Sequence, residues 1–332
     1  MRAAGSPHSH LTRGYAIALA AAAILSTTAI FIRHLTLTYH IPALVLAFWR
    51  DGFVCVTLLP VLGLLSPRLL AVKRRHLPYL VGWGLLLATF NATWTLSVAL
   101  NGAAVATVLV YSSAGFTVLL GWLILDEHLG WGKLLAVAVS LGGCVLVSGA
   151  LDAAAWRTNV AGIVTGILSG LCYAIYSLMG RSASNRGLNP WTTVLYTFAF
   201  ATVALLLFNL VPGGVVPGAA ARPAELLWLG DAVAGWVVLF LLAAGPTVAG
   251  FGLYNVSLGY LPSGVANLVV SLEPVFTAVT AYLVFGELLT VVQLGGSAMI
   301  LAGVIFLRLH EGWLQGRTRP AAGEAARPTA AH

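Results

Sequence analysis

The sequence predicts an all-α integral membrane protein with ten transmembrane helices, arranged as two inverted five-helix repeats. Of its 332 residues, 59% are hydrophobic and only 8% are charged, whereas a soluble globular domain carries about 25% charged residues. Apolar runs of about twenty residues recur along the chain, and this is the length that crosses a hydrocarbon core of about 30 Å. The second half of the chain also repeats the first half in sequence.

Each apolar run is expected to be a helix, because a lipid-exposed backbone has to satisfy its own hydrogen bonds. Most connections between the runs are short, so consecutive helices are expected to be antiparallel neighbours. The predicted spans are residues 14–34, 42–64, 77–99, 103–125, 132–150, 160–180, 190–212, 233–257, 263–285 and 291–308.

The basic residues predict the orientation of these spans. With the N-terminus inside, thirteen of the 17 Lys and Arg residues fall in inside segments, three fall outside (Arg33, Arg157 and Arg222) and Arg50 falls within a span. Basic residues are enriched in cytoplasmic loops. We therefore expect a multi-pass protein of the cytoplasmic membrane of the cell, with both termini cytoplasmic.

An internal repeat appears when the chain is shifted by 160 positions, which places residues 102–147 on 262–307. The identical pairs include Phe116/Phe276, Thr117/Thr277, Glu127/Glu287 and Gly143/Gly303. A shift of 148 aligns the earlier part, with Pro42 on Pro190. The repeats are therefore predicted at 14–150 and 160–308, five spans each. Because each repeat has an odd number of spans, the second repeat has the opposite orientation in the membrane. Inverted repeats of this kind place a binding site near the bilayer midplane.

Three segments resemble a known family. LAFWRDGF (46–53), GAAVATVLVYSSAGFTVLLGWLILDEHLG (102–130) and the segment LVVSLEPVFTAVTAYLVFGELLT around Glu273 are similar to the EamA repeats of the drug/metabolite transporter superfamily. The resemblance covers about 14–308, and it implies ten helices, a central cavity and transport of small metabolites. Ser113 and Ala114 stand where the family often has a proline, which predicts a straighter fourth helix.

Glu273 is the first candidate site residue, because it lies ten residues into a predicted span and so about 15 Å deep. A charge at that depth costs at least about 2.5 kcal/mol. Pro274 leaves the carbonyl of Val270 without its helical donor, and Thr277 lies on the same helix face as Glu273. Two interpretations stay open: a carboxylate that binds a substrate ammonium or a proton, or a hydrogen-bonded side chain that braces helix packing.

Arg50 and Asp51 lie in the middle of the second span. Adjacent helical residues point about 100° apart, so we do not expect these two to pair on one face. Arg50 is then expected either to bind a carboxylate or phosphate of the substrate, or to form a structural bridge for which Glu273 is one possible partner.

Other polar and aromatic residues also fall within the predicted spans. A lining of this kind suits amino acids, nucleobases or drug-like aromatic solutes, and the alternative is ordinary hydrogen bonding between helices. These further candidates are Asn91, Trp94, Tyr111, Ser113, Tyr173, Tyr176, Tyr254 and Asn255.

The expected function is that of a secondary transporter, with export as the expected direction and alternating access around a central cavity as the mechanism. The alternatives are an integral-membrane enzyme or a channel, but the chain has no HExxH or GxSxG motif for catalysis and no Walker A motif for ATP. We expect no metal, no cofactor and no nucleic-acid partner. The expected partners are a small-molecule substrate, the lipid bilayer and, if Glu273 titrates, protons.

Overall fold

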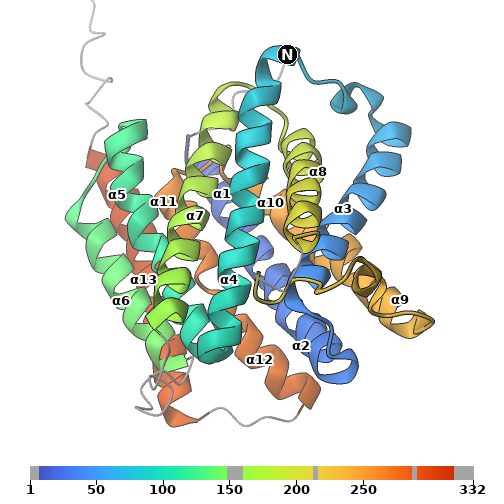
Figure 1. Cartoon of the computed structure of the whole chain (residues 1–332). Helices are drawn as coiled ribbons and strands as arrows, with labels where there is room; N and C mark the ends of the chain where they lie inside the picture. Colours follow the sequence, from blue (N-terminus) through green and yellow to red (C-terminus); the bar gives the residue numbers. More distant parts are fainter. Residues whose placement is uncertain (1–6, 148–159, 212–215, 286–289, 318–332) are drawn as a thin grey trace, which may run out of the picture.

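The computed structural model describes residues 7–147, 160–211, 216–285 and 290–317, and this part of the chain is helical with no strand. Long helices run side by side in a bundle (Figure 1). The helices are α1 (Pro7–Ser26), α2 (Thr28–Tyr39), α3 (Ala43–Leu65), α4 (Leu77–Tyr111), α5 (Ser113–Leu125), α6 (Trp131–Val147), α7 (Val160–Asn185), α8 (Pro190–Asn209), α9 (Val233–Leu242), α10 (Val248–Ser257), α11 (Ser263–Val270), α12 (Glu273–Phe285) and α13 (Val291–Arg317).

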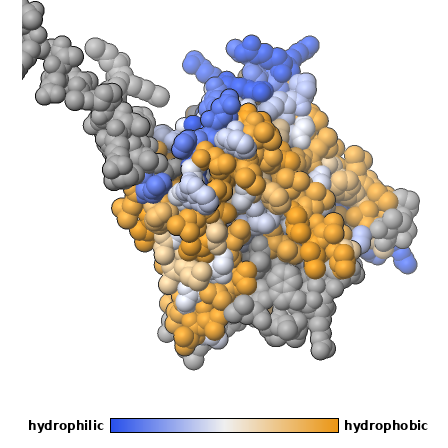
Figure 2. Space-filling model, turned by 90° about the vertical axis from the view of Figure 1, so that its left-hand side faces the viewer, coloured by the Kyte–Doolittle hydropathy of each residue, from blue (hydrophilic) through white to orange (hydrophobic). Residues whose placement is uncertain are grey.

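The surface of the bundle is suited to lipid. Hydrophobic side chains cover much of the face in Figure 2, and hydrophilic ones gather at its upper end. Leu64, Trp131 and Val291 are each at least 85% exposed, and an apolar surface of this extent marks a membrane or partner contact. Five helical stretches are long and apolar enough to cross a membrane: Leu11–Tyr39, Ala43–Leu65, Val160–Asn185, Pro190–Asn209 and Val233–Ser257.

Three shorter apolar helices, Leu109–Leu125, Trp131–Leu146 and Val291–Leu307, coincide with the predicted fourth, fifth and tenth spans. The number ten stays a prediction. Residues 148–150, the expected end of the first repeat, lie outside the described residues.

Helix α4 covers both the predicted third span and the start of the fourth, and it bends back on itself. A methyl group built on Gly166 of α7 would lie 2.6 Å from both Ser97 Oγ and Leu109 Cδ1. A straight helix would separate these two residues by about 18 Å. The chain therefore reverses between Ser97 and Leu109, where the two antiparallel spans are predicted to meet.

Several helices are interrupted inside the bundle. Helices α4 and α5 are separated at Ser112, and α11 and α12 are separated at Ser271 and Leu272. The expectation of a straighter fourth helix is therefore wrong: the backbone tightens at Ser112, whose N–H bonds to Leu109 three residues back, without any proline. Under the shift of 160, Ser112 falls on Leu272, so the two interruptions occupy equivalent positions in the predicted repeats.

Contacts between the predicted repeats follow a paired pattern. Helix α1 packs on α10, α11 and α12, while its counterpart α7 packs on α4 and α5. Helix α3 packs on α8, α5 on α11, and α6 on α13. The pairs α3 with α8 and α6 with α13 each join a helix to its counterpart, and α1 packs on α12 as α7 packs on α5, which is the pattern expected of two halves related by a two-fold axis. The direction of that axis relative to a membrane stays a prediction.

Both ends of the described chain lie at one end of the bundle, which we call the basic end because it carries Arg13, Lys133, Arg181 and Arg186. The Arg13 guanidinium lies over the Tyr260 ring, 5.5 Å from its centroid. Ser263 is bonded to Glu127, and a methyl group on Gly132 would meet the ring of His310. These contacts place the start of α1 and the end of α13 at the same end of the bundle, which agrees with the predicted even number of spans.

Candidate functional site

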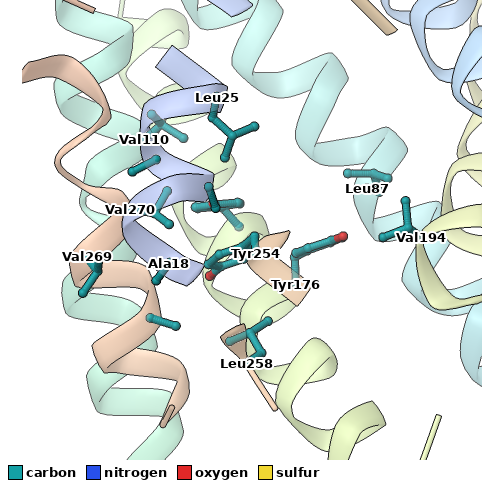
Figure 3. Close-up of a cluster of buried hydrophobic side chains, with 14 of the residues drawn as sticks. Ala18, Leu25, Leu87, Val110, Tyr176, Val194, Tyr254, Leu258, Val269 and Val270 are labelled. Atoms are coloured by element: carbon teal, nitrogen blue, oxygen red, sulfur yellow. The ribbon is translucent and has the colours of Figure 1, made fainter. Parts of the chain in front are cut away.

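Three tyrosines form a stack in the buried centre. Tyr173 of α7 stacks on Tyr176 of the same helix, with 6.3 Å between ring centroids and 13° between planes, and on Tyr254 of α10 at 5.8 Å and 19°. Phe90 of α4 stacks on Tyr173 at 5.4 Å. Figure 3 shows Tyr176 and Tyr254 side by side, with Leu258 near both. Helices of both predicted repeats therefore contribute to one aromatic cluster.

Hydrogen bonds extend this cluster across four helices. The hydroxyls of Ser177 and Tyr254 are 2.6 Å apart, and Asn267 Nδ2 donates to Ser177 Oγ at 3.2 Å. Ser113 Oγ donates to Asn267 Oδ1 at 3.2 Å. This series of hydrogen bonds connects α5, α11, α7 and α10. It gives partners to polar groups whose burial without a hydrogen bond would destabilise the fold.

Asn255 leaves one hydrogen-bonding atom unused. Its Nδ2 donates to the Tyr176 hydroxyl and to the Phe251 carbonyl, both at 2.9 Å, while its Oδ1 has no partner among the described residues. The indole N–H of Trp83, whose ring lies 5.1 Å from that of Tyr176, also lacks a described acceptor. An unused donor and an unused acceptor thus border the same tyrosine, where a bound polar group or water can satisfy them.

Glu273 is the first residue of α12, so the prediction that it lies inside a continuous helix is wrong. The interruption at Ser271 and Leu272 places its carboxyl group at a helix N-terminus, where the backbone dipole favours negative charge. The Tyr111 hydroxyl lies near this carboxyl group. The side chain of Glu273 is half-buried. It forms no ion pair with another described residue.

Arg50 pairs with its own neighbour, contrary to the expectation from helix geometry. Its Nε and Nη2 both donate to Asp51 Oδ1 at 3.1 Å, because the long side chain folds back along α3. Nη2 also donates to Asn91 Oδ1 at 2.8 Å, and Asn91 Nδ2 donates to Asp51 Oδ2 at 3.0 Å. All three side chains are buried. The positive charge of Arg50 is therefore compensated within this triad, and Glu273 is not its partner.

The remaining predicted residues, Thr277 and Trp94, have no described contact with the three tyrosines. Thr277 Oγ1 donates to the Ser26 carbonyl at 3.2 Å, next to the break between α1 and α2. Trp94 is half-buried against the apolar core. Sequence reasoning missed Ser177 and Asn267, although Asn267 is a polar side chain inside an apolar helix and offered the same signal as Asn91. Within the described residues no group of His, Cys, Asp and Glu is arranged to hold a metal ion.

Comparison with known proteins identifies relatives over nearly the whole chain. Residues 12–149 and 160–309 match the sequence profile of the EamA-like transporter family. An uncharacterized transporter of Archaeoglobus fulgidus is 28% identical over 66% of this chain and 73% of its own length. A probable amino-acid metabolite efflux pump of Salmonella typhimurium is 24% identical over 80% of this chain and 85% of its own. A crystal structure with 17% sequence identity shares the fold, with a TM-score of 0.71 over 90% of this chain and 98% of that one.

Proposed function

The chain belongs to the EamA-like transporter family, and from this membership we propose that it is a secondary transporter that exports a small metabolite across the cytoplasmic membrane by alternating access. The observation that carries the proposal is the buried polar cluster at the helix interruptions, built by both repeats around Tyr173 and Glu273. Interrupted helices whose ends meet between two repeats are the usual framework of a transporter site.

The charges of the site favour a substrate that carries an ammonium group. Arg50 is neutralised by Asp51, so it offers no free cation to a substrate carboxylate or phosphate. Glu273 has no ion-pair partner among the described residues, and the Tyr111 hydroxyl and the Tyr173 ring stand close to it. A carboxylate beside aromatic rings binds cations through charge and through the ring faces. Amino acids and amines fit this arrangement better than organic anions, and the name of the Salmonella relative agrees with an amino-acid substrate.

Glu273 also gives the transporter a means of coupling to protons. The chain has no Walker A motif, so transport has to use an ion gradient or the gradient of the substrate itself. A carboxyl group that holds either a proton or a substrate ammonium exchanges one for the other, and export of the substrate then accompanies entry of a proton. We expect the nearby Tyr111 hydroxyl to keep the carboxyl oriented in either state.

Transport assays in proteoliposomes test the proposal. The purified protein should catalyse saturable counterflow of a radiolabelled solute, and competition by a panel of amino acids, amines, nucleobases and organic anions should single out ammonium-bearing compounds. Empty liposomes and liposomes with denatured protein are the controls. Competition by organic anions alone would contradict the substrate class, and an ion conductance without counterflow would indicate a channel.

A further inference from the structure

Helix α11 begins without a capping side chain of its own. Its first residue, Ser263, follows Pro262, which supplies no side-chain acceptor, although the first N–H groups of a helix need acceptors. The acceptor comes from Glu127, 136 positions earlier in the chain. Glu127 Oε1 accepts hydrogen bonds from Ser263 N–H at 2.8 Å and from Ser263 Oγ at 2.9 Å. A carboxylate of the first repeat thus caps a helix of the second.

The local backbone directs Glu127 toward this position. Asp126 ends α5 in the left-handed conformation, with φ of 53°, and the N–H of Glu127 bonds back to the Gly121 carbonyl at 3.1 Å. The side chain therefore turns back along α5. A methyl group on Gly121 would lie 2.8 Å from Glu127 Oε2 and 3.1 Å from Ser263 Oγ, so the glycine leaves the room that the contact needs.

The capping contact is the outer end of a longer interface between the repeats. Further in, Val118 of α5 packs against Gly264, where a methyl group would meet Val118 Cγ2 at 2.7 Å. The interface reaches the tyrosine cluster through the bond from Ser113 to Asn267. Arg181 Nη1 also donates to the Leu258 carbonyl at 2.8 Å in the turn before α11. These contacts hold α5 against α11, and α7 against the end of α10, at the basic end of the bundle.

We propose that Glu127 is a gate residue: its contact with Ser263 holds the basic end closed in one state of the transport cycle and breaks when α5 and α11 separate. This inference rests on the alternating access of the proposed function. A charge-assisted bond to a helix N-terminus is strong while the repeats are packed. Water replaces both partners once the repeats part, so the contact is reversible.

A reporter cysteine at Thr117 tests the gate without knowledge of the substrate. Thr117 is fully buried and lies on the same face of α5 as Ser113 and Gly121, one turn from each. The rate at which N-ethylmaleimide modifies Thr117→Cys in nanodiscs, followed by peptide mass spectrometry, measures how often α5 and α11 separate. Adding Glu127→Gln should increase this rate about tenfold, the effect of weakening a helix cap.

Asp126→Asn is the matched control, because it removes the same charge from the adjacent exposed residue and asparagine tolerates the left-handed conformation. Ser263→Ala should accelerate labelling less than Glu127→Gln, and the two changes together should not exceed Glu127→Gln alone. Equal labelling rates in Glu127→Gln and Asp126→Asn would overturn the gate. A lower melting temperature with an unchanged labelling rate would also overturn it, since that pattern describes a purely structural cap.

Transport is measured separately, by counterflow with the unsubstituted protein. Absence of counterflow there rejects the proposed function, whereas the labelling comparison alone decides whether the Glu127 contact opens. The two failures are therefore distinguishable.

Discussion

Replacing Arg50 with methionine should strongly destabilise the protein. The size of the loss in unfolding free energy follows from the contacts of Arg50 with Asp51 and Asn91. The change removes both bonds to Asp51 Oδ1 at 3.1 Å and the bond to Asn91 at 2.8 Å. The carboxylate of Asp51, which is fully buried, keeps only the bond from Asn91 at 3.0 Å. Removing one partner of a buried ion pair costs about 3–5 kcal/mol. We expect Arg50→Met to lower the free energy of unfolding by that amount, measured by SDS-induced unfolding in mixed micelles.

A second substitution separates the charge from the shape of the site. Asp51→Asn in the Arg50→Met background removes the unpaired carboxylate and keeps an acceptor for Asn91, so the remaining loss should fall to about 1–2 kcal/mol. Arg68→Met, at an exposed position, is the control for removing an arginine. The reasoning is refuted if Arg50→Met unfolds within about 0.5 kcal/mol of that control. If the double variant regains stability but not counterflow, Arg50 also acts in transport.

Further predictions concern coupling, packing and topology. Glu273→Gln should abolish pH-dependent accumulation of substrate while counterflow persists, and Asp231→Asn, an exposed acidic position, should change neither; unchanged accumulation in Glu273→Gln would exclude proton coupling through this residue. Gly166→Ala places a methyl group 2.6 Å from two side chains and should destabilise the fold by about 1–3 kcal/mol. Gly82→Ala, with open space around it, should be neutral or stabilising by up to about 1 kcal/mol; the same loss at both glycines in an unfolding assay would contradict the packing argument. A reporter fused near Pro217 should read external, and a cytoplasmic reading there would reverse the predicted orientation.

The helical membrane class and the family could be predicted from the sequence because both depend on properties that lie along the chain. The length of apolar runs decides whether a segment can cross a bilayer, and the segments around Arg50, Ser113 and Glu273 carry the family resemblance directly. Candidate residues of the site could be identified for a related reason: a polar side chain in an apolar helix needs a partner wherever it lies. Tyr173, Tyr176, Tyr254 and Asn255 were found in this way, and the structure brings them into contact.

The pairing of these residues with one another depends on how the helices pack. Helix periodicity separates Arg50 from Asp51, yet the flexible arginine side chain folds back onto its neighbour because Asn91, 41 positions away, completes the triad. The contact of Glu127 with Ser263 likewise depends on a helix that lacks its own cap and lies in the other repeat. Sequence spacing determines which residues share a helix face, whereas the free energy of a buried charge depends on the groups that surround it. Those groups come from distant segments, so their arrangement exists only once the helices have packed.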